Sequence, residues 1–290
     1  MRSSVHAVIA VKSLALAKSR LADRLHPRDR PRLVLAMLAD TVDAATATPE
    51  IGSVTVVTPD PRVADLVRGL GAHVHPEPPG PDHAQLPVGG IWHRAEAARR
   101  HERGEATQLP LRAGSHIQGT PLAHDPAALH ATDPVPPRGG LNAALSAAAE
   151  AVRRHHGPVE LLALQADLPA LRPVELSGML TAAPENRRAV VADHAGTGTV
   201  ALLVRDGSAP LAPLFGTDSA RRHIAAGAVE LLGDWPGLRQ DVDTADDLGR
   251  AMALGVGVNT RALLSELGVS RRRDGKHSVD RTGPPVRRPA

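Results

Sequence analysis

An acid that directly follows a short apolar run is the residue best placed in this sequence for metal chemistry. Residues 161–166 are nearly all apolar, as expected of a strand buried on both faces, and Asp167 and Pro169 then interrupt the run. In open α/β sheets, ligands bind outside the carboxyl ends of the strands. A carboxylate at that place can hold a divalent metal ion and its phosphates. The alternative is that Asp167 caps the helix that follows.

A pair of acids later in the chain extends this hypothesis. Asp241 and Asp243 alternate along a segment that precedes a predicted helix. On an extended segment both side chains point to one face, so one of them could complete a metal site with Asp167. The alternative is that Asp243 or Thr244 only caps the helix.

Three cations lie within nine residues after the first apolar run. Lys12, Lys18 and Arg20 fall on a loop that leaves a strand end, where two ammonium groups and a forked guanidinium suit a triphosphate. The alternative is a solvated helix face. No G-x-G-x-x-G follows this run and no G-x-x-x-x-G-K-[ST] occurs in the sequence, which removes the main support for a dinucleotide dehydrogenase or a P-loop NTPase.

Two further segments could bind anions through the backbone. The glycines of segment 196–199 would let N–H groups approach an anion, and segment 215–221 runs into a helix N-terminus with Ser219 in its first turn. Each segment could instead be only a turn or a helix cap. Their closeness in the sequence favours phosphate binding.

Alternating strands and helices must position these residues. The apolar patterns predict strands over 5–11, 54–58, 72–75, 161–166, 189–193, 199–204 and 229–232, and helices over 31–45, 61–70, 141–152, 173–180, 218–226, 244–253 and 259–267. This alternation with short links predicts an α/β fold with a mostly parallel (mixed) sheet flanked by helices.

Composition limits the domain organisation and the class of protein. The chain has 290 residues, of which 42% are hydrophobic, and we expect a single domain over 1–269 with a proline-rich insertion at about 76–137 and a basic, disordered tail over 270–290. The absence of Cys excludes disulfides and zinc–sulfur sites. No apolar run is long enough to span a membrane and no signal peptide is evident, so a cytoplasmic protein without a membrane partner is expected.

The charge distribution argues against a nucleic-acid partner. The chain carries +3 and residues 270–290 alone carry +5, so the remainder carries −2. Nucleic-acid-binding modules need basic faces and usually aromatic platforms, whereas this chain has no Tyr, one Phe and two Trp.

Several short motifs then occur in one order along about residues 5–75 and 138–256. They are Lys12…Lys18-Ser-Arg20-Leu, Val34-Leu-Ala-Met-Leu, Gln165-Ala-Asp167-Leu-Pro-Ala-Leu, Ala192-Asp193…Gly196-Thr-Gly-Thr199, Phe215-Gly-Thr-Asp-Ser219-Ala-Arg and Trp235-Pro-Gly-Leu-Arg-Gln-Asp-Val-Asp243-Thr. Together they resemble the guanylyltransferases of deazaflavin coenzyme F420 biosynthesis.

The resemblance implies an α/β nucleotidyltransferase fold of the nucleotide-diphospho-sugar transferase type. It implies an enzyme that condenses phosphoenolpyruvate with GTP to enolpyruvoyl-2-diphospho-5'-guanosine and diphosphate in coenzyme F420 biosynthesis. The alternatives are 2-phospho-L-lactate as the acceptor and, from another class, a nucleotide-binding protein without catalysis. A homo-oligomer and a downstream transferase of the same pathway are the protein partners left open.

Carried over by position, the resemblance also implies Mg²⁺ as the cofactor and a set of site residues. These are Asp167, Asp241 and Asp243 for the metal; Thr199, Gly216 and Ser219 for phosphoenolpyruvate; Lys12, Lys18, Arg20 and Asn142 for the nucleotide; and Lys12, Lys18, Arg20 and Asp167 for catalysis. The sequence departs from the family at Ala166, where glycine is usual, and in the length of the 76–137 segment.

Overall fold

The computed structural model describes residues 4–12, 14, 18–22, 24–77 and 140–269, so residues 78–137 of the predicted insertion and the predicted tail lie outside the described residues. The strands are β1 (Val5–Ala10), β2 (Ile51–Thr58), β3 (His73–Pro76), β4 (Glu160–Leu164), β5 (Arg188–Ala192), β6 (Thr199–Val204) and β7 (Val229–Glu230). The helices are η2 (Ser19–Leu21), α1 (Arg30–Thr46), α2 (Pro61–Gly69), α4 (Leu141–His156), α5 (Pro173–Ala182), α6 (Ser219–Ala225), α7 (Pro236–Arg239), α8 (Ala245–Leu254) and α9 (Val258–Glu266).

Every predicted strand and helix is present, with ends that differ by a few residues, whereas η2 and α7 were not predicted. The strand expected over 161–166 ends at Leu164, and one more backbone bond, from Gln165 N–H to the Val200 carbonyl at 2.9 Å, continues the ladder. Asp167 therefore lies beyond the strand, as expected, and the strand itself ends two residues earlier than predicted.

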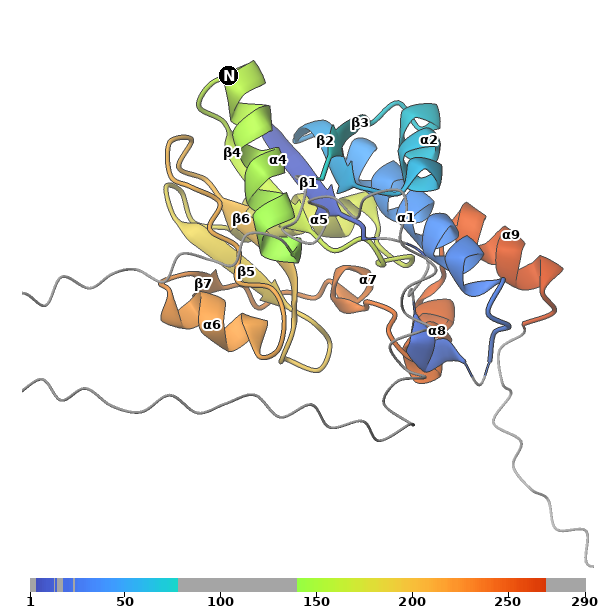
Figure 1. Cartoon of the computed structure of the whole chain (residues 1–290). Coiled ribbons are helices and arrows are strands. Elements are labelled where there is room, and N and C mark those ends of the chain that lie inside the picture. The colour runs from blue at the N-terminus through green and yellow to red at the C-terminus, as the bar shows by residue number, and fades with distance from the viewer. Residues whose placement is uncertain (1–3, 13, 15–17, 23, 78–139, 270–290) are drawn as a thin grey trace, which may run out of the picture. The chain divides into compact units, whose positions relative to one another are not determined.

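The strands form one mixed sheet with the order β3-β2-β1-β4-β6-β5-β7 (Figure 1). Neighbouring strands are parallel except that β6 runs antiparallel to both β4 and β5. The predicted mostly parallel sheet flanked by helices is thus confirmed. Because β6 is reversed, its first residue, Thr199, lies opposite the last residue of β5, Ala192, at the carboxyl edge of the other strands.

Alternating side chains of the strands supply two cores, one on each face of the sheet. In β1, Ala7 and Ile9 belong to the larger core, which also contains side chains of α1, α2, α5, α8 and α9. Val8 points to the other face, where α4 packs together with Phe215. Figure 1 shows α4 lying across one face of the sheet, with α1 and α5 behind it. The sheet is thus covered on both sides, and its carboxyl edge is the place where loops from both cores meet.

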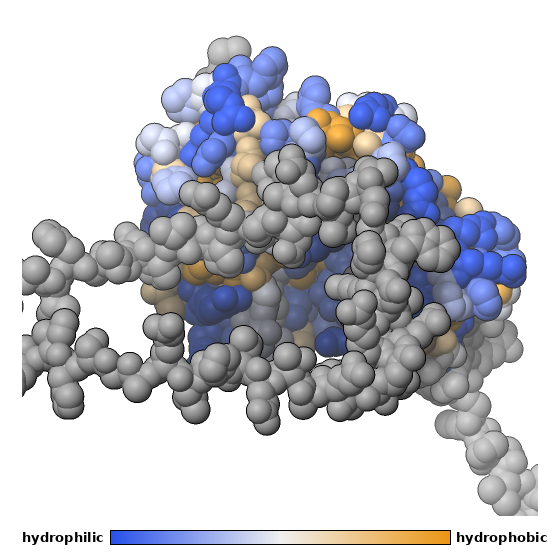
Figure 2. Space-filling model, viewed as in Figure 1, coloured by the Kyte–Doolittle hydropathy of each residue, from blue (hydrophilic) through white to orange (hydrophobic). Residues whose placement is uncertain are grey.

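The surface is mainly polar on the side that Figure 2 shows, where hydrophilic residues predominate among those described. In the part of the chain that the structure describes, no helix combines the length and apolarity needed to cross a membrane.

Candidate functional site

A cleft of about 720 Å³ lies at the carboxyl edge of β1 and β4. Five of the residues predicted from the sequence line it: Lys12, Lys18, Arg20, Asp167 and Asp243. Gln165 and Ala166 form part of the same wall. The cations after the first strand and the acid after the fourth strand are therefore brought together, as the strand order requires.

Lys18 projects into the cleft from a bend in the backbone. Its φ of 53° is in the left-handed region, which is uncommon for a residue with a side chain. The turn of η2 follows directly, with Leu21 N–H donating to the Lys18 carbonyl at 2.9 Å and the Leu21 side chain fully buried. Leu21 thus anchors this bend in the core. The bend points the Lys18 side chain into the cleft instead of placing it on a solvated helix face. Lys12 and Arg20 are exposed on the walls of the cleft.

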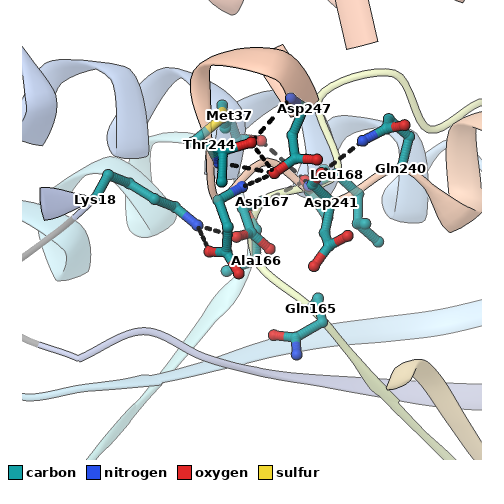
Figure 3. Close-up of polar contacts among 12 residues, drawn as sticks. Lys18, Met37, Gln165, Ala166, Asp167, Leu168, Gln240, Asp241, Thr244 and Asp247 are labelled. Carbon is teal, nitrogen blue, oxygen red and sulfur yellow. Dashed lines mark hydrogen bonds and ion pairs between the residues drawn. The ribbon is translucent and has the colours of Figure 1, made fainter. Parts of the chain in front are cut away.

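The Lys18 ammonium lies between two carboxylates. It donates to Asp167 Oδ2 in a short contact and to Asp243 Oδ1 at 2.8 Å (Figure 3). The side chains of Lys18 and Asp167 are mostly buried, whereas that of Asp243 is 56% exposed. Asp167 does not cap the next helix, because α5 begins at Pro173 with Arg172 as its N-cap residue. The Asp167 carboxylate is therefore not used as a helix cap and lines the cleft, where it pairs with Lys18.

The loop that carries Asp167 is held from α1. Thr41 accepts a hydrogen bond from Leu168 N–H at 3.1 Å and donates to the Met37 carbonyl at 2.9 Å. Leu168 is fully buried in the core beneath. The neighbours of Asp167 are therefore tied to a helix, which fixes the starting point of its side chain.

The segment with the acid pair is tied to the same loop. Val242 N–H donates to the Asp167 carbonyl at 3.2 Å, and the Val242 side chain is fully buried. The acids on either side of it lie away from the core, as predicted for alternating positions. The predicted alternative of an N-cap is met by Thr244, whose hydroxyl accepts from Asp247 N–H at 3.2 Å. Asp243 is thereby left to pair with Lys18.

A close backbone contact positions this segment from its other end. Gly237, in α7, donates its N–H to Glu175 Oε1 at 2.9 Å. A Cβ at this glycine would lie 2.1 Å from the Ala170 carbonyl oxygen, so only glycine allows α7 to approach the loop after β4 this closely. The short helix that the sequence analysis missed thus brings residues 240–243 beside Asp167.

We name Asp167, Asp241 and Asp243 together with Lys18 the acidic cluster. Burial lowers the pKa of Lys18, but the two adjacent carboxylates more than offset this, so that its pKa lies above the usual value. The pKa of Asp241 is raised to about 7, first by burial and then by the negative charges of Asp167, Asp243 and Asp193, against the opposing effect of Lys18. The cluster therefore has more negative charge than its one lysine balances.

This excess of charge is what a divalent cation would compensate. The donors are carboxylate oxygens, which Mg²⁺ prefers, and burial together with the neighbouring carboxylates disfavours the charged form of Asp241, which a nearby cation would favour. In the described ranges, however, no three Asp, Glu or His side chains are already assembled to hold a metal ion. The chemistry of the three acids fits Mg²⁺, and the metal site itself remains a prediction.

The remaining predicted residues lie around the start of β6. Gln165, on the cleft wall, donates from Nε2 to the Thr199 carbonyl at 3.2 Å and so links the two regions. Ser219 begins α6 and is buried, and Gly216 has a φ of 124°, a conformation that favours glycine.

One expectation for this region is wrong. The N–H groups of Thr197 and Gly198 are not available to an anionic ligand, because both already donate at 2.9 Å to the Asp193 carboxylate. Gly196 N–H donates to the Asp193 carbonyl at 3.1 Å. The glycine-rich turn is thus closed on a side chain that precedes it, a local competitor that the sequence analysis did not weigh.

A buried histidine connects the elements around Thr199. His223 is 1% exposed; its Nδ1 lies 3.1 Å from Thr199 Oγ1, and its Nε2 accepts from Leu214 N–H at 2.8 Å. Burial and the nearby Arg188 and Arg222 charges lower the pKa of His223 to about 4, although a contact with the Ser219 backbone opposes them. We name Thr199 and His223 the threonine–histidine pair. The sequence analysis missed His223, although it follows Ser219 by four residues and so shares its helix face.

Asn142 lies in the first turn of α4, the helix that packs on the smaller core. Its Nδ2 donates to the Phe215 carbonyl at 3.1 Å and its Oδ1 accepts from Phe215 N–H at 2.9 Å. Both functional atoms of this amide, predicted for the nucleotide, are engaged with the loop that leads to Gly216. The structure thus gives Asn142 a role in holding that loop.

Comparison with known proteins shows which proteins this chain is similar to. No family model matches the chain. It is 55% identical over 267 residues to the phosphoenolpyruvate guanylyltransferase of Nocardia farcinica, covering 92% of this chain and 93% of that one. It is 45% identical over 262 residues to the phosphoenolpyruvate guanylyltransferase of Rhodococcus opacus, covering 90% of each.

A solved structure agrees on the fold. The crystal structure of a protein from Desulfovibrio desulfuricans, classed as a nucleotide-diphospho-sugar transferase, matches 92% of this chain and 96% of its own with a TM-score of 0.56 at 13% identity. That match concerns the fold alone, whereas the two relatives are similar over nearly their whole length at 45% identity or more. The chain belongs to the phosphoenolpyruvate guanylyltransferase family.

Proposed function

We propose that this chain transfers the guanylyl group of GTP to phosphoenolpyruvate. An oxygen of the phosphoenolpyruvate phosphate attacks the α-phosphorus of GTP, and the bond from that phosphorus to the oxygen it shares with the β-phosphorus breaks. The products are enolpyruvoyl-2-diphospho-5'-guanosine and diphosphate. The attacking phosphate is already ionised near neutral pH, so no general base is needed.

One observation carries this proposal: cations and acids from distant parts of the chain meet in the cleft. The difficulty of the reaction is to bring two polyanions together, and it is solved by charge neutralisation and in-line positioning. Lys12, Lys18 and Arg20 present three cations in the cleft, two of them exposed. We assign them to the phosphates of GTP. The relatives named above support the same activity.

We assign Mg²⁺ to Asp167, Asp241 and Asp243. When bound, the ion would neutralise phosphate charge and orient the reacting groups. Lys18 is the residue that would then exchange its carboxylate partners for phosphate oxygens, because among the described residues it alone is paired with both Asp167 and Asp243. Its raised pKa keeps it cationic beside the two carboxylates.

We assign the acceptor to the region around Thr199, Gly216 and Ser219. Gln165 links that region to the cleft through the Thr199 carbonyl. The proposed setting is coenzyme F420 biosynthesis in the cytoplasm, with a downstream transferase taking up the product. The acceptor alternative is 2-phospho-L-lactate, which differs by a methyl group and a double bond.

The test is diphosphate release from GTP with Mg²⁺ and each of three acceptors: phosphoenolpyruvate, 2-phospho-L-lactate and 3-phosphoglycerate. We expect release with phosphoenolpyruvate and none with 3-phosphoglycerate. Faster release with 2-phospho-L-lactate would reassign the acceptor. Binding of GTP without release for any acceptor would leave the non-catalytic alternative.

A further inference from the structure

We infer that His223 is a positioning residue that fixes the Thr199 hydroxyl as a hydrogen-bond donor to the anionic acceptor. The inference rests on the proposed function, since it deepens the role of the acceptor region. It assigns the directing of Thr199 to a side chain that lies behind it rather than in the cleft.

The hydrogen bonds determine which ring nitrogen carries the proton. A backbone N–H can only donate, so the contact from Leu214 N–H at 2.8 Å requires a lone pair on His223 Nε2. A neutral imidazole then carries its hydrogen on Nδ1, which lies 3.1 Å from Thr199 Oγ1. His223 can therefore only donate to Thr199, whose hydroxyl oxygen accepts, while the Ser219 backbone is a second contact of the ring.

This direction leaves the hydrogen of the Thr199 hydroxyl available. A hydroxyl has one donor and two acceptor sites, and His223 uses an acceptor site. The opposite tautomer would draw the Thr199 hydrogen toward the ring and offer only lone pairs to a ligand. An anionic phosphate or carboxylate needs donors, so only the observed arrangement makes Thr199 a suitable partner.

The surroundings of the pair keep this arrangement in place. His223 is 1% exposed and Thr199 is 2% exposed, so water does not compete for the bond between them, and an acceptor that binds the hydroxyl must displace the atoms that cover it. The Phe215 ring packs edge-on against the imidazole, with centroids 5.4 Å apart. Burial, together with the positive charges of Arg188 and Arg222, lowers the pKa of His223 and keeps the ring neutral near pH 7. The loop at Leu214 and Phe215 is held by two side chains: Leu214 N–H donates to His223, and Phe215 N–H donates to Asn142.

Two amide variants separate the two hydrogen bonds of the ring. In His223→Asn the amide reaches the position of Nδ1 and can still donate to Thr199. In His223→Gln the amide reaches the position of Nε2 and can accept from Leu214, but no donor faces Thr199. Thr199→Val removes the hydroxyl at nearly constant shape, and Thr199→Ser keeps it as the matched control.

We expect His223→Gln to raise KM for phosphoenolpyruvate about 10- to 100-fold, because a donor to a charged group is lost, with KM for GTP changed less than about twofold. His223→Asn and Thr199→Ser should lie within about fivefold of the parent chain. The double variant His223→Gln/Thr199→Val should be no worse than Thr199→Val alone, because both changes remove the same donor. Multiplying effects, or equal increases of both KM values, would overturn the inference.

A second measurement does not depend on turnover. In ¹⁵N spectra of the imidazole, His223 of the parent chain should be the neutral Nδ1–H tautomer from pH 5.5 to 8. An Nε2–H tautomer would overturn the positioning role even in an active enzyme. Failure to release diphosphate with any acceptor would instead overturn the proposed function, and the spectra would still decide how Thr199 is oriented.

Discussion

The acidic cluster and the threonine–histidine pair lie at the same edge of the sheet but differ in how their charges are satisfied. In the acidic cluster, three carboxylates share one lysine, and the pKa of Asp241 rises to about 7 after burial and mutual repulsion. In the threonine–histidine pair, both ring nitrogens have partners, and the pKa of His223 falls to about 4.

The difference separates two tasks of a group-transfer site. The acidic cluster carries more negative charge than its lysine balances, and in the proposed function it would gain stability from cations that arrive with the nucleotide, so that the site would respond to its ligand. The threonine–histidine pair is complete before any ligand binds, which is how a donor is preorganised. Ligand binding should therefore change the acidic cluster far more than the pair.

The largest effect is expected at Asp167. Asp167→Asn removes a charge from the proposed metal ligands and a partner of Lys18, so diphosphate release should fall by about 10³-fold or more while the chain stays folded. Steady-state rates and thermal melting would measure this. Asp65→Asn is the matched control, because Asp65 is 77% exposed on α2 and pairs only with Arg68 among the described residues. Unchanged turnover in Asp167→Asn would remove this residue from the site.

Lys18→Met should separate catalysis from metal binding. Diphosphate release should fall by about 100-fold, because a cation that faces the phosphates is lost. Without nucleotide, Mn²⁺ should bind the variant about tenfold more tightly, because the ammonium no longer competes for Asp167 and Asp243. Titration calorimetry would measure the affinity. Weaker Mn²⁺ binding would show that Lys18 does not compete with the metal.

Asp241 should lower the free energy of unfolding of the chain as pH rises. Its pKa is about 7 in the folded chain against an ordinary value of 3.8, so the folded state holds the extra proton between these values and the free energy of unfolding falls from about pH 4 to pH 7. Asp241→Asn should remove this loss and gain about 1–2 kcal/mol at pH 8, once solvent screening is allowed for. Denaturant unfolding at pH 5 and pH 8 would measure it. A difference between variant and parent that is independent of pH would contradict the assignment.

His223 should change the free energy of unfolding in the opposite direction. Its pKa is about 4 in the folded chain and about 6.5 when unfolded, so the unfolded state takes up the proton first and stability falls as pH drops from about 6.5 toward 4. His223→Gln lacks this titration, and the stability gap to the parent should narrow by about 1–2 kcal/mol between pH 7.5 and pH 5. Melting temperatures across this range would show it. A gap that widens in acid would mean that the histidine is already charged.

The sequence predicted the features that depend on the periodicity of apolar residues and on the order of motifs along the chain. The apolar run before Asp167 and the alternation around Val242 indicated buried backbone with acids at its edge, and both patterns hold because the core dictates them. The conjunction of motifs indicated the family correctly. These signals are repeated over many residues, so a local exception does not erase them.

What could not be predicted depends on single local contacts. The left-handed bend at Lys18 has no glycine to signal it, and the closure of the 196–198 turn on Asp193 depends on one carboxylate that accepts from two nearby N–H groups. His223 would look the same in the sequence if it were a surface residue of a short helix. Its role becomes visible only when β6 and the loop at Leu214 are packed around it.

The reversal of β6 has a mechanical consequence. Thr199 enters the sheet where the neighbouring strands leave it, between Ala192 of β5 and the Gln165 side chain, so its main chain is held on both flanks. To displace its main chain, one strand would have to slide past its neighbours. The acids lie on loops, whose backbone is easier to shift. The end of the site proposed for the acceptor therefore has the more firmly held backbone, and the end proposed for the nucleotide has the backbone that can adjust to its ligand.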